Sequence, residues 1–196
     1  MRCILAVLAA ALLAGCGNSE KARLANPNTA YIPSTGGGEA QPGDDSISYW
    51  DGDGVPGPPS VIIYLKEQRA YFYKGDQLVG VSQVSAGREG HNTPIGNYKI
   101  VQKDLDHASN LYGDYVDASG NVVQKDVEVG KDPKPPGAVF KGAPMPFFMR
   151  ITGGVGMHKG YLPGYPASHG CIRMPGKMAE SFFNNVEVGT PVQIVD

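Results

Sequence analysis

The residues best suited to chemistry lie in one stretch, 156–175, which reads GMHKGYLPGYPASHGCIRMP. It contains a thiol, Cys171, and two imidazoles, His158 and His169. A thiol becomes a strong nucleophile when a neighbouring base or positive charge favours the thiolate. An imidazole can accept the thiol's proton and later give one to a leaving amine near neutral pH. Together these residue types indicate acyl transfer through a cysteine nucleophile.

The residues around Cys171 supply the remaining parts of such a site. Gly170 frees the backbone to present N–H groups to a tetrahedral oxyanion, and Ser168 has a hydroxyl able to orient an imidazole. His169 lies two residues before Cys171, so in an extended segment the two share a face, roughly 6.5–7 Å apart along the backbone. His158 lies on a separate segment, and the Gly- and Pro-rich loop between them can fold it over the thiol. We therefore expect His158 to be the general base and His169 to have a supporting role.

Two other interpretations of this stretch use the same residues. His158, His169 and Cys171 could be three ligands of a zinc ion, but the sequence contains no C-x-x-C or H-x-x-x-H pair. The stretch could also be a structural turn around a hydrogen-bonded histidine. We expect a catalytic site that uses neither a metal nor a cofactor.

The first sixteen residues, MRCILAVLAAALLAGC, are typical of an exported lipoprotein. A positive charge at the second residue precedes an apolar run, 4–14, which is too short to span a bilayer. The run ends in small residues before Cys16 and resembles the bacterial lipobox; a buried N-terminal helix is the alternative. We expect residues 1–15 to be a signal peptide and Cys16 to carry acyl chains that hold the protein to a membrane.

Composition narrows the remaining possibilities. The chain has 196 residues, enough for one modest domain with appendages. Its net charge of −2 leaves no basic stripe, so we expect no nucleic-acid partner. The 27 Gly and 16 Pro, without a triplet repeat, favour a turn-rich β domain and a loose linker. We expect a flexible tether over residues 16–59 and the folded domain over residues 60–196.

The folded part is expected to be mainly β. Short runs rich in β-branched and aromatic residues, separated by turn residues, predict successive antiparallel strands. These strands are predicted at 61–65, 69–75, 77–87, 97–101, 147–152 and 191–195, and a short helix is predicted at 177–184. Residues 104–146 form a long, irregular insert with a weak hairpin at 118–121, which suggests a functional loop. The expected fold is a β-sandwich with one or two short helices and a long loop or hairpin insert.

The motif SHGCIR at 168–173, preceded by a histidine, resembles the active-site signature of L,D-transpeptidases with the YkuD (ErfK/YbiS/YcfS/YnhG) catalytic domain. The likeness includes the TPxG turn at 93–96, the DHxSNxYG segment at 106–113 and the GAPMP run at 142–146. Many members have His-Gly at the upstream histidine, where this chain has His158-Lys159-Gly160. The resemblance extends from about residue 60 onward and implies the YkuD fold for that part of the chain.

The resemblance also implies a reaction on peptidoglycan stem peptides. Cys171 would attack the carbonyl before the terminal D-Ala and form a thioester, and His158 would be the base. The remaining site residues would shape the site and bind substrate or oxyanion; they are Ser168, His169, Gly170, Arg173, Tyr161 and Tyr165. A neighbouring stem's amine would then make a 3–3 cross-link, or a free D-amino acid would replace the terminal one. Carbapenems are implied as covalent inhibitors.

Two alternatives to transpeptidation stay open. With water as acceptor, the same fold would be a hydrolytic L,D-carboxypeptidase or amidase. A non-catalytic wall-binding lipoprotein is the alternative from another class, although it would need no thiol at position 171. The expected location is the cell envelope, anchored through Cys16 and facing the periplasm. Gly17 after the lipidated cysteine favours the outer membrane if the host is Gram-negative.

Overall fold

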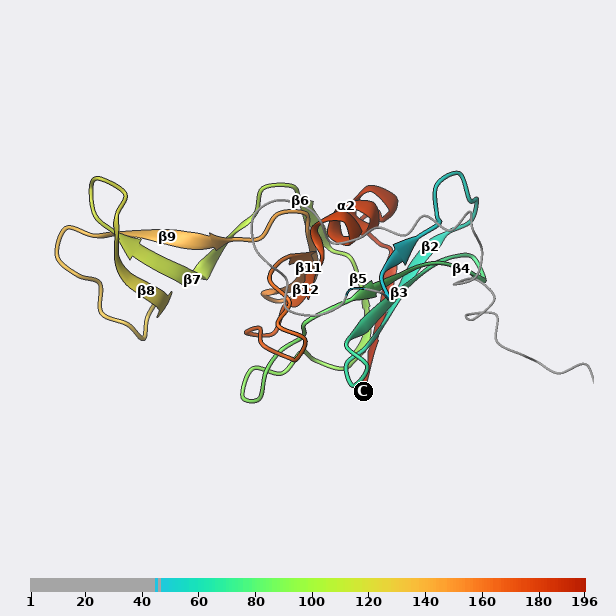
Figure 1. The fold of residues 1–196 in the computed structure, drawn as a ribbon, viewed down its shortest axis with the longest axis horizontal. Helices are drawn as coiled ribbons and strands as arrows, with labels where there is room; N and C mark the ends of the chain where they lie inside the picture. The colour runs from blue at the N-terminus through green and yellow to red at the C-terminus, as the bar shows by residue number, and fades with distance from the viewer. Residues whose placement is uncertain (1–44, 46) are drawn as a thin grey trace, which may run out of the picture.

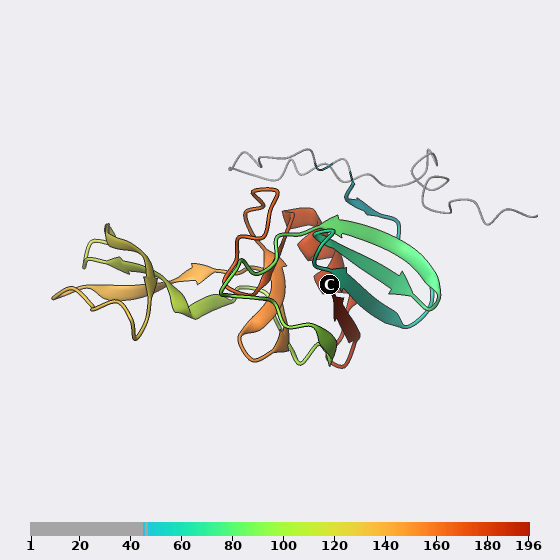
Figure 2. The same cartoon turned by 90° about the horizontal axis from the view of Figure 1, so that it is seen from below.

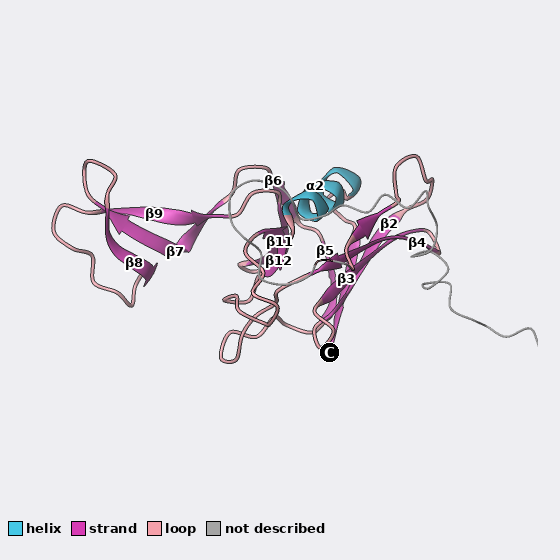
Figure 3. Cartoon of the chain, in the orientation of Figure 1, coloured by secondary structure: helices cyan, strands magenta, loops and turns pink. Residues whose placement is uncertain are grey.

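The computed structural model describes residue 45 and residues 47–196. The predicted signal peptide (1–15), Cys16 and most of the predicted tether lie outside the described residues. The described chain forms a body, which carries two sheets and a helix, and an arm that projects from it (Figures 1 and 2). The mainly β class predicted from the sequence is confirmed (Figure 3).

The larger sheet of the body has six strands in the order β1-β4-β3-β2-β13-β5. Its centre is an antiparallel meander of β2 (Pro59–Tyr64), β3 (Arg69–Lys74) and β4 (Gln77–Gln83). Alternate residues of β2 and β3 are buried, which is the period-2 pattern of a sheet with one core face. The C-terminal strand β13 (Pro191–Val195) pairs parallel with β2 and antiparallel with β5 (Gly96–Lys99). These strands agree with the predicted ones.

The edge strand β1 (Tyr49–Trp50) lies inside the range expected to be a tether. It pairs with β4, and Trp50 is only 3% exposed in the hydrophobic core. The indole contacts the Phe72 ring edge-on at 5.1 Å between centroids, and its Nε1–H donates to Asp53 Oδ1 at 2.8 Å. The folded body therefore begins before residue 60, because burial of Trp50 fixes this end of the segment.

The second sheet has four strands in the order β12-β11-β10-β6. The strands are β6 (Gln102–Asp104), β10 (Phe148–Thr152), β11 (Val155–Lys159) and β12 (Ile172–Met174). Helix α2 (Gly176–Asn185) follows β12 and confirms the predicted helix. One hydrophobic cluster joins both sheets and the helix through buried residues such as Phe72, Met157 and Phe182. This common core fixes β11, which carries His158, and β12, which begins directly after Cys171.

The insert 104–146 is more regular than the sequence indicates. Most of it is a three-stranded antiparallel sheet, the arm, made of β7 (Ala108–Val116), β8 (Val122–Glu128) and β9 (Val139–Pro144). The predicted hairpin at 118–121 is confirmed as the turn between β7 and β8. The expectation of an irregular segment is wrong, and the reason is exposure. Much of β8 is exposed, so it shows no period of buried residues.

Within the described residues, no helix is long and apolar enough to cross a membrane.

Candidate active site

The parallel pairing of β11 with β12 brings the two main candidate residues together. Its register places Met157 opposite Ile172, and both side chains are fully buried in the core. Because side chains alternate along a strand, His158 and Cys171, each next to one of these residues, belong to the opposite face. The sequence prediction that the Gly- and Pro-rich loop returns the cysteine to the histidine is consistent with this register.

Cys171 is a partly buried thiol immediately before β12. Its Sγ donates a long hydrogen bond to the carbonyl oxygen of Gly154, at 3.5 Å. Burial raises the pKa of the thiol, whereas a backbone hydrogen bond from Gly156 and the charges of Arg173 and Arg150 act in the opposite direction. The resting side chain is therefore a neutral thiol that has two cations nearby to favour a developing thiolate.

His158 is buried, with 6% of its surface exposed. Its Nδ1 lies 2.7 Å from the carbonyl oxygen of Lys159. Because a carbonyl only accepts, Nδ1 carries the proton and Nε2 is left as the basic nitrogen. Burial lowers the pKa of His158 to about 4; the Lys159 carbonyl opposes this, while Arg173 and His107 act with it. The imidazole is neutral near pH 7, which is the form that a general base needs.

The turn before Cys171 is held by hydroxyl groups. Ser168 Oγ donates to the carbonyl oxygen of Cys171 at 2.5 Å and accepts from the Gly170 N–H at 3.0 Å. Thr93 Oγ1 donates to the Gly170 carbonyl oxygen at 2.8 Å, and Gly170 has φ 114°, a value that favours glycine. Ser168 thus binds backbone groups, whereas the sequence suggested that it orients an imidazole. The Gly170 N–H, close to where the sequence predicted oxyanion donors, is bound to Ser168 Oγ.

His169 is exposed and belongs to a separate group of side chains. Its Nε2 lies 2.8 Å from the Arg88 guanidinium group, so Nε2 accepts this hydrogen bond. The ring stacks on Tyr112 of the arm at 4.2 Å between centroids and contacts His91 edge-on at 4.7 Å. Burial, followed by the charge of Arg88, lowers the pKa of His169. A ring occupied in this way suits the predicted supporting role better than the role of base.

Sequence reasoning did not single out His107, which forms a layer behind the base. Its ring stacks on Phe148 at 4.2 Å between centroids, and Phe148 lies 6.2 Å from the His158 ring. His107 Nδ1 also pairs with Asp104 Oδ2 at 3.0 Å. The DHxSNxYG segment at 106–113 contains His107, but its residue types do not predict this stacking. Its position makes it part of the wall that buries His158.

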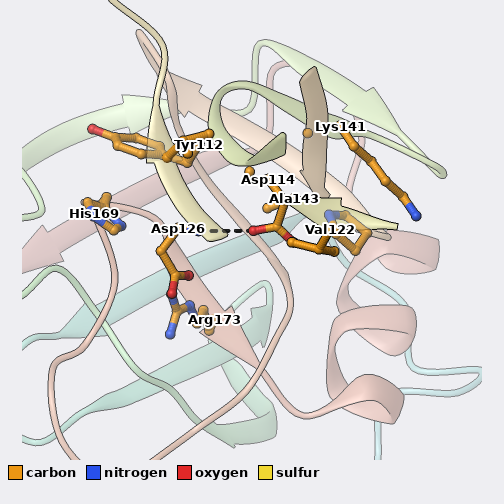
Figure 4. Close-up of a pocket in the computed structure, with 12 residues that line it drawn as sticks. Tyr112, Asp114, Val122, Asp126, Lys141, Ala143, His169 and Arg173 are labelled. Atoms are coloured by element: carbon orange, nitrogen blue, oxygen red, sulfur yellow. Dashed lines mark hydrogen bonds between the residues drawn. The ribbon is translucent and has the colours of Figure 1, made fainter. Parts of the chain in front are cut away.

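A pocket of about 440 Å³ opens between the arm and the catalytic turn (Figure 4). It is lined by Tyr112, Gly113, Asp114, Val122, Asp126, Val127, Lys141, Gly142, Ala143, Pro144, His169 and Arg173. Arg173 is held there by the backbone, since its N–H and carbonyl oxygen both pair with Ser85. Tyr161 and Tyr165, expected to bind substrate, are 42% and 61% exposed and do not line this pocket. The structure therefore brings Arg173 and His169 to the pocket but not the two tyrosines.

No cluster of three or more His, Cys, Asp or Glu side chains within residue 45 and residues 47–196 is arranged to hold a metal ion. The zinc interpretation needed His158, His169 and Cys171 to converge on one point. The ring of His169 instead contacts the rings of Tyr112 and His91, and its Nε2 accepts a hydrogen bond from Arg88.

Comparison with known proteins identifies the family to which the folded part of the chain is similar. Residues 58–194 match the family model described as the YkuD L,D-transpeptidase catalytic domain. The chain is 29% identical over 144 residues to the probable L,D-transpeptidase YbiS of Escherichia coli K12, covering 69% of this chain and 44% of that protein. It is 29% identical over 143 residues to the putative L,D-transpeptidase YqjB of Bacillus subtilis, covering 72% of this chain and 74% of that protein. The chain thus spans less than half the length of YbiS.

A solved structure of the L,D-transpeptidase LdtMt1 in complex with imipenem has the same fold. The TM-score is 0.52 at 18% sequence identity, over 70% of this chain and 58% of that one. Since the family model matches well over half of the sequence, this chain belongs to the family of YkuD-type L,D-transpeptidase catalytic domains.

Proposed function

We propose that this protein is a cysteine-dependent L,D-transpeptidase that acts on peptidoglycan stem peptides. The products would be 3–3 cross-links or stems with an exchanged terminal D-amino acid. The observation that carries the proposal is the tautomer and placement of His158. Its Nδ1 lies 2.7 Å from the Lys159 carbonyl oxygen, which leaves Nε2 as the basic nitrogen, and in the β11–β12 register the His158 side chain belongs to the same face as Cys171.

In the first step, the Cys171 sulfur attacks the carbonyl carbon before the terminal D-residue. Burial disfavours both the thiolate and the imidazolium, so the resting pair is neutral. Proton transfer from sulfur to His158 Nε2 therefore accompanies formation of the C–S bond. The imidazolium gives that proton to the departing amine as the C–N bond breaks. Arg173 and Arg150 stabilise the negative charge that develops on sulfur.

In the second step, an amine attacks the thioester carbon. A C–N bond forms, the C–S bond breaks, and the proton released by the amine returns to the Cys171 sulfur through His158. Water in place of the amine would make the protein an L,D-carboxypeptidase. A pocket beside Arg173 large enough for an amino-acid-sized group favours an amine acceptor.

Mass spectrometry of the products tests the proposal. Purified protein incubated with tetrapeptide stems should release D-Ala and give a cross-linked dimer joined 3–3. Tripeptide alone would identify the hydrolytic alternative. Unchanged stems under conditions in which the protein is folded would contradict an enzymatic role and favour a wall-binding lipoprotein.

The same thiol should react with carbapenems. LdtMt1 was solved with imipenem, a β-lactam whose strained carbonyl is an easier target than a peptide. The intact mass of this protein should rise by one drug molecule after incubation with imipenem. An unchanged mass would contradict a reactive Cys171.

We also propose that Cys16 anchors the protein to a membrane of the cell envelope, with the catalytic domain facing the periplasm. The lipobox-like sequence before Cys16 supports this. The mature protein should begin at Cys16 and partition into detergent, and Cys16→Ser should leave an uncut or water-soluble form. Recovery of an unmodified chain from the cytoplasm would overturn the proposal.

A further inference from the structure

The base proposed above, His158, belongs to a row of side chains that crosses the four-stranded sheet. In the β10–β11 register Met149 is opposite Met157, so Phe148 comes opposite His158. The β6–β10 register places Asp104 opposite Phe148. Residues opposite each other on neighbouring strands share a face of the sheet, so Asp104, Phe148 and His158 form one row. The edge strand β6 is thereby linked to the base through a single aromatic ring.

His107 folds back over this row from the loop after β6. Because a carboxylate only accepts, His107 Nδ1 donates to Asp104 Oδ2, at 3.0 Å. The His107 ring lies 4.2 Å from the Phe148 ring between centroids, with 19° between the ring planes. The side chain of His107 is 19% exposed, whereas Phe148 is fully buried and His158 nearly so. His107 is therefore the outer ring of the three.

The backbone of His107 reaches the base by a second route. Its carbonyl oxygen accepts the Met145 N–H at 2.7 Å, and the carbonyl oxygen of the next residue, Pro146, accepts the Lys159 N–H at 2.9 Å. The carbonyl oxygen of Lys159 is the partner of His158 Nδ1. Contacts that begin at His107 thus lead both to the ring of the base and to the peptide that sets its tautomer.

The segment between these two routes is strained. Phe147, directly before β10, has φ 58°, which is an outlier for a bulky residue. Strain of this kind persists only where the surrounding structure holds it, and it clusters at functional sites. The loop 105–107 holds it here, since the Leu105 carbonyl oxygen accepts the Phe147 N–H at 2.9 Å, beside the bond from Met145 to His107.

We propose that His107 is a positioning residue for the base: its ring aligns His158 and shields it from water, and Asp104 holds that ring in place. The inference rests on the proposed function, in which His158 is the general base, and adds the residue that keeps this base ready. His107 acts through Phe148 and through the backbone at 145–146. It takes no part in proton transfer or bond formation.

Shielding has a measurable consequence for the His158 ring. Burial is the main cause that lowers its pKa to about 4, and the charges of Arg173 and His107 act in the same direction. Removing the outer ring should admit water, so the pKa of His158 should return toward its ordinary value near 6.5. The titratable or charged groups on the elements packed against it are Cys171 and Arg173 at β12, Arg150 on β10, and Asp104 with His107 at β6.

NMR titration of the histidine rings tests the inference without any substrate, and His158→Gln identifies the His158 signals. In His107→Ala the midpoint of the His158 titration should rise by about one pH unit or more. His107→Phe is the matched control, because it keeps an aromatic ring on Phe148 without an imidazole, and its midpoint should stay close to that of wild type. An unchanged midpoint in His107→Ala, or an equal rise in both variants, would overturn the inference.

Substitutions of Asp104 test the second part of the proposal and still decide it if His107→Ala does not fold. Asp104→Ala removes the acceptor that holds His107 and should raise the His158 midpoint by a smaller amount. Asp104→Asn keeps an acceptor oxygen and should stay closer to wild type. Equal midpoints in wild type, Asp104→Ala and Asp104→Asn would show that the pair does not position the base.

Acylation by imipenem gives a second readout. In His107→Ala the maximal rate should fall about tenfold, because a base that moves loses its alignment with the thiol. The imipenem concentration at half-maximal rate should change little, and His107→Phe should recover most of the rate. If wild type forms no acyl-enzyme, the proposed function fails, while the NMR titration still decides whether His107 shields His158. If wild type is acylated and His107→Ala keeps both its rate and its midpoint, only the inference is overturned.

Discussion

The catalytic turn and the arm form two walls of one pocket, but they are held in place to very different degrees. The turn is fixed at several points: Arg173 pairs with Ser85, Ser168 accepts the Arg88 N–H, and Thr93 binds Gly170. The arm has a small hydrophobic cluster of its own, made of Tyr115, Val127, Ala138 and the half-buried Phe140. It also leaves several valines exposed, among them Val122, Val123 and Val139.

This difference matches what each wall has to do. A nucleophile and its base must keep their relative geometry, because small displacements lower the rate steeply. The arm carries neither residue of the proposed catalytic pair, so it can tolerate more movement. The stacking of Tyr112 on His169 is where the arm touches the catalytic turn. Changes in the turn should therefore slow the proposed chemistry more than changes in the arm.

The largest effect should come from Cys171→Ala, which removes the proposed nucleophile. Transpeptidation and acylation by imipenem should both be abolished. The folded state should persist, because the thiol is partly buried and makes one long hydrogen bond. Product analysis, intact mass and circular dichroism of the variant check these outcomes. Any cross-linking by a folded variant would remove Cys171 from the role of nucleophile.

The next effect separates the two histidines. His158→Ala should slow acylation by imipenem on the order of 10²-fold or more, because the variant lacks the proposed general base. His169→Ala should cost less, because its Nε2 is already bound to Arg88. Both variants must first be shown to fold. A nearly inactive His169→Ala beside a fast His158→Ala would reverse the assignment.

The pH dependence of acylation should show that the base is buried. Burial holds the pKa of His158 at about 4, so the imidazole stays unprotonated until the pH falls to that range. Protonated His158 cannot accept the thiol proton, and acylation should therefore fall as the pH drops through about 4. Imipenem acylation followed by mass across pH, with circular dichroism at each pH, measures this limb. A limb centred near 6.5 would mean that the base is a solvent-exposed imidazole.

The body was predictable from sequence because its strands have one buried and one exposed face. The run VIIYL and the run RAYFYK alternate in this way, and β2 and β3 formed where they were expected. Two elements carried too little local signal. Strand β1 has only two residues, and what fixes it is the contact of its Trp50 with Phe72, which is distant in sequence. Strand β8 exposes much of its length, so only its pairing with β7 makes it a strand.

The candidate site divides in the same way. His158 and Cys171 were recognisable because their residue types and spacing specify a chemical role. Arg88 and His91 were not, because they reach His169 through contacts between segments about eighty residues apart. Such contacts depend on which loops the sheets bring together, which no local pattern records. The position of Asp126 in the lining of the pocket could not be predicted for the same reason.

The smallest effect on global stability should come from a matched change in the arm. Val127 in the arm and Val79 in the body are each about fully buried, and Val→Ala removes the same atoms at either position. Val79→Ala creates a cavity in the core shared by both sheets and should lower the free energy of unfolding by about 2 kcal/mol. Val127→Ala weakens only the arm's small cluster, so the main thermal transition should stay close to that of wild type. Its effect should appear as faster amide hydrogen exchange confined to β7, β8 and β9. An equal fall in the main transition for both variants would mean that arm and body unfold as one unit.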